Sequence, residues 1–202
     1  MNRIPCRYYL NSSLEMADFC INYDHSLSNK IFYLNACVCI ELLLKNLVIY
    51  KVYKENINKN IEDLLLKTTD LNKNIINGFT EGSAKIEKEK QAEIKYQLFL
   101  RLVKKELKNN GHNLYKLLNF DNNLKTEIGL KLVESVHNEF INNFKLTLND
   151  GTIIIFPTLE GARYNVFSGE QNVFDIISID NSKNLQKIIE KIKEYISKKV
   201  KY

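Results

Sequence analysis

Two side chains of opposite charge stand four residues apart in an otherwise apolar stretch of the sequence. Glu41 and Lys45 lie at the end of the run Cys39-Ile40-Glu41-Leu42-Leu43-Leu44-Lys45, in the favourable order for an ion pair along a helix. A carboxylate and an ammonium group there could bind a charged ligand or pair with each other. Because an unpaired buried charge is too costly to keep, we expect a structural ion pair, or a pair that takes a further partner, in preference to a catalytic role.

Histidine is the side chain best suited to proton transfer near neutral pH, and two histidines follow lysines in this sequence. His137 comes six positions after Lys131, and His112 comes seven positions after Lys105. A lysine could hold a phosphate as a point charge while the histidine moves a proton. Residues six positions apart lie on nearly opposite sides of an ideal helix, which argues against Lys131 and His137 as one site within a subunit. His112 also has a local alternative, a helix entry in which its side chain bonds to the backbone or to a neighbouring acid.

The formal net charge of +5 is located at the C-terminal end of the chain. From Asn181 onward, seven lysines against two glutamates account for all of it, so residues 1–180 are formally neutral. We expect contacts with nucleic acid first at Lys187, Lys191 and Lys198. The alternative is a solvated lysine face that keeps the protein soluble.

The composition predicts a chain that buries its own core without disulfides or metal. Its 202 residues are 45% hydrophobic and 26% charged, as in ordinary globular domains. The four cysteines have no zinc-binding spacing and are expected as buried free thiols in a reducing cytosol. Residues 1–10 lack the apolar stretch of a signal peptide, and the apolar run 36–50 is too short to span a bilayer. We therefore expect a cytoplasmic protein, away from membranes and with no cofactor or metal.

Helices are expected to position most of these residues. The capping box Ser12-x-x-Glu15 predicts the start of the first helix. A long central helix follows, and it is apolar almost all round, which is typical of a helix covered on several sides. The predicted helices after the first cover residues 29–53, 57–79, 84–107, 113–120 and 124–144.

The pattern changes to strands after residue 144. Residues 145–148 and 152–156 flank Asn149-Asp150-Gly151, a good hairpin turn, and residues 173–179 are a candidate third strand. The last helix, residues 182–200, carries an apolar face of Leu185, Ile188, Ile189, Ile192, Ile196 and Val200. We predict a mainly α single domain over residues 1–202, with a helical core (1–144), a β-containing insertion (145–180) and a basic C-terminal helix (181–202).

The motifs around Glu41 and His112 together resemble the helical core of the HEPN superfamily, whose members bind or cut RNA in many prokaryotic defence and toxin systems. The acidic residue and lysine of the central helix are similar to those that recur in that family. Residues Gly111-His112-Asn113-Leu114 are similar to its Gly-His-Asp/Asn-Leu turn. The resemblance implies a HEPN-like helical bundle, pairing as a homodimer. In a toxin–antitoxin setting it also implies a cognate antitoxin or a nucleotidyltransferase-like partner.

Ribonucleases of this superfamily carry an arginine a few residues before a histidine on a late helix. No arginine stands at that distance before a histidine here, and the nearest imitation is Lys131 before His137. Lysine lacks the guanidinium fork that clamps a phosphate. The resemblance therefore implies a non-catalytic module that binds RNA, a nucleotide or a protein partner. The alternatives are a metal-independent ribonuclease with a degenerate Lys/His site and a helical protein-interaction subunit without nucleic-acid function.

Arg163-Tyr164 is similar to an Arg-Tyr-Pro element that follows the helical core in some HEPN-like chains, with Asn165 in place of the proline. The resemblance leaves Arg163 two roles. It could bind an anionic ligand, or it could pair with Glu41 and tie the late segment to the central helix. We expect the second role, because it supplies the partner that Glu41 needs.

Overall fold

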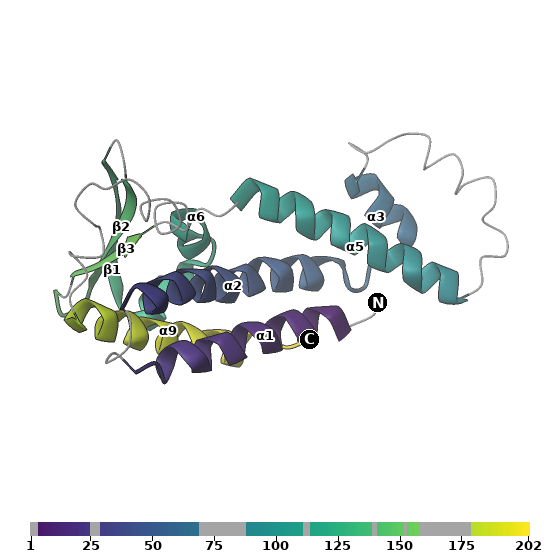
Figure 1. Cartoon of the computed structure of the whole chain (residues 1–202). Coiled ribbons are helices and arrows are strands. Elements are labelled where there is room, and N and C mark those ends of the chain that lie inside the picture. The colour runs from purple at the N-terminus through teal and green to yellow at the C-terminus, as the bar shows by residue number, and fades with distance from the viewer. Residues whose placement is uncertain are drawn as a thin grey trace. The chain divides into compact units, whose positions relative to one another are not determined.

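The computed structural model describes residues 4–24, 29–68, 88–110, 114–138, 141–151, 153–157 and 179–202. Within these residues the fold is mainly helical, as predicted (Figure 1). The helices are α1 (Ile4–Ile21), α2 (Asn29–Asn56), α3 (Ile61–Thr68), α5 (Lys88–Asn110), α6 (Leu114–Asn119), α7 (Asn122–Ile128) and α9 (Ile179–Lys199). The strands are β1 (Leu130–Asn138), β2 (Ile141–Leu148) and β3 (Ile153–Pro157).

Contacts between residues divide the chain into two compact units. The first unit comprises residues 1–7, 48–111 and 202, and the second comprises residues 8–47 and 112–201. Helices α1 and α2 contribute residues to both. The candidate site residues at Glu41, Lys45 and the C-terminal lysines belong to the second unit.

Helix α2 supplies much of the buried core. Its apolar side chains from Phe32 to Leu44 include many with almost no exposed surface, among them Phe32, Tyr33, Ala36, Cys37, Cys39, Ile40, Leu43 and Leu44. The sequence predicts this, because a helix that is apolar almost all round must be covered on several sides. By length and composition alone, the region Ile31–Asn56 is apolar enough to cross a membrane, and it extends beyond the run 36–50 that was expected to be too short. Of its most apolar 18-residue stretch, 67% is buried inside the structure.

Helix α1 begins earlier than expected. It starts at Ile4, so Ser12 and Glu15 lie inside the helix and the predicted capping box is wrong. The neighbouring Ser13 is the buried polar residue here. Its hydroxyl donates to the carbonyl of Leu10 (2.7 Å) and accepts a hydrogen bond from the Asn46 amide of α2 (2.8 Å).

Helix α9 packs its predicted apolar face into the second unit. Leu185, Ile188, Ile189, Ile192, Ile196 and Val200 are all buried. Burial of one such side chain contributes about 1.5–3 kcal/mol of transfer free energy. This face therefore makes α9 an integral part of the core.

Helix α9 also closes the C-terminal end of α1. The Gln186 amide donates to the carbonyls of Cys20 (3.0 Å), Ile21 (3.3 Å) and Tyr23 (3.2 Å). The last carbonyls of a helix have no partner within the helix itself. Gln186 supplies that partner from a residue far along the chain.

The sheet is larger than predicted and begins earlier. Strands β1, β2 and β3 form an antiparallel meander. The predicted turn at residues 149–151 joins β2 to β3, with Gly151 at a φ of 85°. Residues 130–138 and 141–144 were predicted as helix but belong to β1 and β2, so the boundary of the helical core at residue 144 is wrong. The candidate third strand at residues 173–179 lies outside the described residues, except that Ile179 begins α9.

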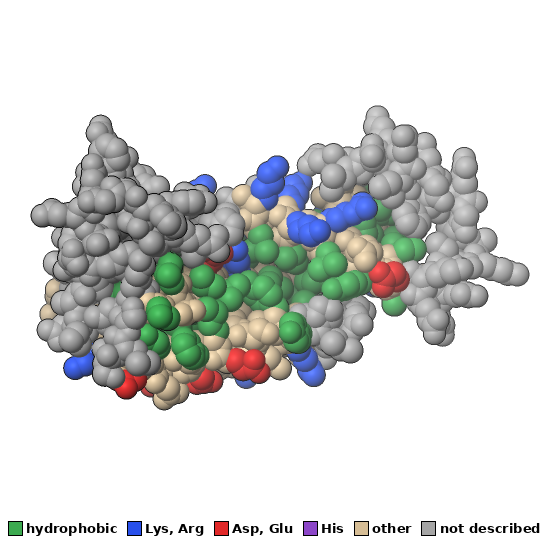
Figure 2. Space-filling model, in the orientation of Figure 1, with side chains coloured by type: hydrophobic (Ala, Val, Ile, Leu, Met, Phe, Trp, Pro, Cys, Tyr) green, Lys and Arg blue, Asp and Glu red, His purple; other side chains and the backbone are tan. Residues whose placement is uncertain are grey.

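Helices α3 and α5 belong to the first unit, together with the end of α2. Tyr53 of α2 makes edge-on ring contacts with Phe99 of α5 and with Tyr202, whose carbonyl accepts a hydrogen bond from Arg7 (2.9 Å). Leu98, Phe99, Leu102 and Val103 are the buried side chains of α5. Lys and Arg side chains gather over the opposite, exposed side of this helix (Figure 2).

Candidate functional site

Glu41 and Lys45 form the ion pair that the sequence predicts. The Lys45 ammonium donates to Glu41 Oε1 at 2.5 Å, and the two side chains are 14% and 8% exposed respectively. The negative charge of Glu41 also reaches Tyr9 of α1. Burial, and secondarily this charge, raises the pKa of the Tyr9 phenol to about 12. Glu41 is therefore a buried carboxylate paired within its own helix, close enough to α1 for its charge to act on the Tyr9 phenol.

The further partner expected for Glu41 lies beyond the described part of the chain. Arg163 and Tyr164 fall in the segment 158–178, outside the described residues. The pairing of Arg163 with Glu41 therefore stays a prediction. What the structure establishes is that Lys45 already neutralises much of the Glu41 charge.

Only one of the two histidine candidates lies among the described residues. His112 lies outside them. His137 belongs to β1, where it pairs with Asn142 of β2, and Lys131 lies at an irregularity near the start of the same strand. Both were expected on a helix. The helical argument for separating Lys131 from His137 therefore no longer applies.

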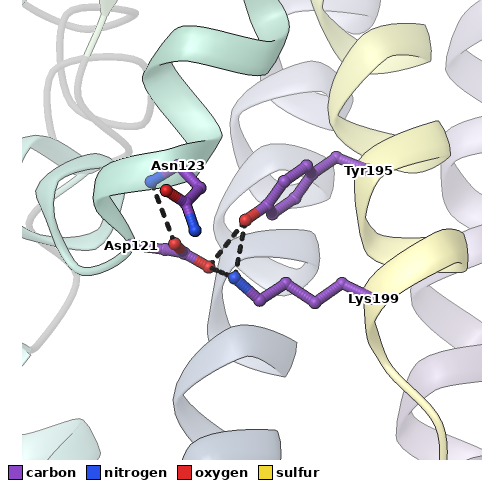
Figure 3. A network of polar contacts seen from close by, with 4 residues as sticks. All are labelled: Asp121, Asn123, Tyr195 and Lys199. Atoms are coloured by element: carbon purple, nitrogen blue, oxygen red, sulfur yellow. Dashed lines mark hydrogen bonds and ion pairs between the residues drawn. The ribbon is translucent and has the colours of Figure 1, made fainter.

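The structure assembles a polar network that the sequence analysis missed. Asp121 stands at the N-cap of α7, and its Oδ1 accepts a hydrogen bond from the Asn123 backbone N–H (3.1 Å). Its other oxygen, Oδ2, accepts a hydrogen bond from the Tyr195 hydroxyl (2.9 Å) and one from the Lys199 ammonium. Lys199 also donates to the Tyr195 oxygen at 2.7 Å (Figure 3). The network joins the start of α7 to the last turns of α9.

Its electrostatics hold each group in a fixed protonation state. Burial works against the charge on Asp121, but hydrogen bonds from Lys199, Tyr195 and Asn123 outweigh it and lower the pKa of the carboxyl. Burial, together with the Asp121 charge, raises the pKa of Tyr195. Burial also opposes the Lys199 charge, but its bonds to Asp121 and Tyr195 prevail and raise the pKa of the ammonium group.

These shifts exclude one attractive chemical reading of the network. A tyrosine four positions before a lysine could act as an acid–base pair if the lysine lowered the pKa of the phenol. Here Asp121 neutralises the lysine, and the pKa of Tyr195 rises. Tyr195 stays a phenol at neutral pH and serves as a hydrogen-bond donor. The network is a cross-link between two helices.

The sequence contains a partial signal for this cross-link. Asp121 before a short helix is a typical N-cap, and residues four apart in a helix, such as Tyr195 and Lys199, are neighbours on its surface. What the sequence lacks is the pairing between them. That pairing depends on a tertiary contact between segments more than seventy residues apart.

The three lysines expected to bind nucleic acid are exposed on α9. Lys187 is exposed, and Lys191 donates to the Ile128 carbonyl at the end of α7 (3.4 Å). The Lys198 Nζ lies 3.7 Å from Glu194 Oε2. Lys198 and Glu194 are 75% and 62% exposed, and such a pair contributes little. Two other lysines of this helix form ion pairs with side chains outside it: Lys193 pairs with Asp18, and Lys199 pairs with Asp121.

The exposed lysines of α9 share one side of the helix. At 100° per residue, Lys183, Lys187, Lys191 and Lys198 fall within an arc of about 80°. We call these four residues the α9 lysine stripe. They lie on the side opposite the buried Ile188, Ile192 and Ile196, so the arrangement places them in solvent along most of the helix. Glu194 lies within this arc and Glu190 about 20° outside it, so both dilute the charge of the stripe.

The four cysteines are buried free thiols, as predicted. Burial raises the pKa of Cys6 to about 11 and that of Cys37 to about 12. The Cys20 and Cys39 thiols, from α1 and α2, share a hydrogen bond, which lowers the pKa of Cys20 and raises that of Cys39. Among the described residues, no group of three or more His, Cys, Asp or Glu side chains could hold a metal ion.

Comparison with models of protein families, with curated proteins and with solved structures finds no match to this chain.

Proposed function

We propose that this protein is a non-catalytic, HEPN-like module that binds RNA through the α9 lysine stripe. The observation that carries the proposal is the exposure of Lys183, Lys187, Lys191 and Lys198 on one side of a helix whose other side is buried. A row of cations on a rigid element attracts a phosphodiester backbone without reading its sequence. In the HEPN-like setting, the RNA belongs to a prokaryotic defence or toxin–antitoxin system in the cytoplasm.

The polar contacts of the described residues support binding over catalysis. Glu41 and Lys45 neutralise each other, and Asp121 fixes Tyr195 and Lys199. A general base needs a pKa near the working pH, whereas the pKa of Asp121 is lowered and that of Tyr195 raised. These groups therefore serve the fold, and the lysine stripe remains available for a ligand.

Charge reversal on the stripe tests the binding proposal. In the double variant K187E/K198E, we expect a labelled single-stranded RNA to bind about 25-fold more weakly at about 0.1 M salt. The reason is that each lost phosphate contact lowers the slope of log affinity against log salt concentration by about 0.7. Lys191 is left intact because it also bonds to the Ile128 carbonyl. Fluorescence anisotropy over a salt series gives both the affinity and the slope.

A matched variant controls for net charge. Lys51 and Lys54 are exposed on α2, and K51E/K54E changes the net charge by the same amount as K187E/K198E. We expect the control to bind RNA within about twofold of the unmodified protein. Equal affinities for the two doubles would contradict the proposal.

A cleavage assay separates this proposal from the ribonuclease alternative. Incubation of end-labelled RNA with the protein and a metal chelator should leave the RNA intact. Cleavage that disappears in H137A or H112A would instead establish the degenerate Lys/His ribonuclease. Lys131 would be tested next, as the cation that holds the phosphate.

The resemblance also implies a homodimer, and we propose that its interface includes Phe19 and Ile31. These large apolar side chains are 53% and 52% exposed. A ring contact links Phe19 to Tyr23, and another links Tyr23 to Phe32, the residue after Ile31. Exposed apolar side chains of this kind, both in the second unit, are suited to a self-complementary contact. A neighbouring gene for a nucleotidyltransferase-like protein would support the toxin–antitoxin setting.

A further inference from the structure

Helix α5 carries a second row of cations that is concealed in the overall charge count. Arg101, Lys104, Lys105 and Lys108 are all exposed. Their spacing of three, four and seven residues places them within about 100° of the helix circumference. We call them the α5 cationic stripe. Residues 1–180 are formally neutral as a whole, so composition alone gives no indication of it.

The other side of α5 is anchored in the first unit. Phe99, Leu102 and Val103 are buried there, which holds the stripe toward solvent. A group of Lys and Arg side chains is visible over α5 in Figure 2. The cations are therefore presented on a packed element, in a fixed order.

The α5 stripe is free of interspersed acidic residues, unlike the lysine stripe of α9. The acidic residue nearest in sequence is Glu106, which is only partly exposed and lies about 140° around the helix from Arg101. On α9, by contrast, Glu190 and Glu194 lie beside the lysines. From Arg101 to Lys108, the side chains described as exposed are all positively charged.

This arrangement works against helix stability unless an anion is present. Like charges three or four positions apart repel, and the stripe contains several such pairs. The helix dipole favours cations at a C-terminus, but its effect fades beyond the last turn. The dipole therefore stabilises the charge of Lys108, near the end of α5, more than that of Arg101. A ligand with several regularly placed negative charges would relieve the repulsion along the whole stripe.

We propose that Arg101, Lys104 and Lys108 form a second phosphate-binding surface, separate from α9, that contacts the backbone of RNA. Arg101 brings a planar guanidinium group that can hold two phosphate oxygens at once. Lys104 and Lys108 add point charges on the same side, one helical turn apart. Lys105 is left out of the contact set because it takes part in another interaction.

The double variant R101E/K108E tests this surface on the full chain. With labelled oligouridine as the probe, we expect affinity at about 0.1 M salt to fall by about 25-fold and the salt-dependence slope to fall by about 1.4. The milder double R101Q/K108Q should show part of the loss, and a thermal melt of each variant verifies folding. R101K should bind more weakly than the unmodified protein but more tightly than R101Q, because it keeps the charge and loses the fork.

The controls distinguish this inference from the proposed function. K51E/K54E carries the same change in net charge and should bind within about twofold of the unmodified protein. If R101E/K108E binds as tightly as that control, the α5 surface is refuted, and a loss confined to K187E/K198E leaves the α9 proposal standing. A loss confined to R101E/K108E supports the α5 surface and refutes the α9 stripe. Unchanged binding in both doubles refutes both.

Discussion

The Glu41–Lys45 pair shows how a charge can be kept inside a helical core. Both side chains are largely buried, and the ammonium meets the carboxylate one helical turn away. Two charges taken out of water incur a desolvation penalty that their attraction only partly repays. Removal of one partner should therefore lower the free energy of unfolding by more than the small net contribution of the intact pair.

Replacement of Lys45 by methionine should lower the free energy of unfolding by about 2–3 kcal/mol, because Glu41 would lose the cation paired with it in a poorly solvated position. Chemical denaturation at neutral pH measures the change. K54M, on the exposed side of the same helix, is the matched control and should change stability by less than about 0.5 kcal/mol. The double E41Q/K45M should recover part of the loss. If K45M is as stable as K54M, Glu41 does not depend on Lys45.

Asp121 combines an N-cap with an ion pair, and two substitutions separate these roles. D121N keeps a good cap but removes the charge. It should cost about 0.5–1 kcal/mol at neutral pH, because Lys199 is about a third exposed and solvent screens the pair. D121A removes the cap as well and should cost about 1 kcal/mol more.

The cost of D121N should depend on pH. The pKa of Asp121 is lowered in the folded protein, so its stabilising effect is complete above the unfolded pKa of about 4 and is lost as pH falls through the folded pKa. Denaturation at neutral pH and near pH 3 should show the gap between D121N and the unmodified protein narrowing with acid. A gap of constant size would rule out the charge as its cause.

At the scale of elements, the sequence is most informative where a pattern has only one reading. The apolar residues of α9 recur at helical spacing, and all six predicted core positions are buried. The residues Ile128, Leu132, Val136, Phe140 and Phe144 instead recur every fourth position, which fits one side of a helix and, as a multiple of two, one side of a strand equally well. The helical prediction was wrong for residues 130–138 and 141–144, which belong to β1 and β2.

The signal that ends α7 was present but isolated. Gly129 adopts a φ of 77° as the C-cap of α7, and its N–H bonds to the carbonyls of Lys125 and Thr126. A single glycine predicts such an end only weakly. The Asp121 network was missed for a related reason, because its partners meet only through packing of α7 against α9.

Gly129 and Gly151 form a matched pair for testing backbone strain. Both have positive φ, so alanine is strained at each by about 1 kcal/mol. A Cβ at Gly129 would also meet Asn149 Nδ2 at 3.2 Å, whereas one at Gly151 would meet nothing within 4 Å. We therefore expect G129A to lower the melting temperature more than G151A. Equal shifts would show that Asn149 moves aside at no cost.

At the scale of the whole molecule, the described surface carries two features, namely rows of cations and exposed large apolar side chains. Cations line the exposed sides of α5 and α9, while large apolar side chains are exposed on α1, on α3 and near the start of α2. The sequence locates the first kind of surface only at the C-terminus, because net charge sums over residues that face different directions. It does not locate the second, because residue type alone does not distinguish an exposed apolar side chain from a buried one.

The exposed apolar side chains lead to a prediction about assembly. If Phe19 and Ile31 of one protomer pack against the same residues of its partner, the protein is a dimer. Light scattering at micromolar concentration should then give about twice the chain mass of 23.6 kDa. The double F19E/I31E should give the monomer mass, because two charges per chain would then be forced into an apolar contact. Leu66 of α3 is 70% exposed, so L66E is the matched control and should remain dimeric. A monomer in the unmodified protein would exclude the homodimer. A dimer that survives F19E/I31E would move the interface to another surface.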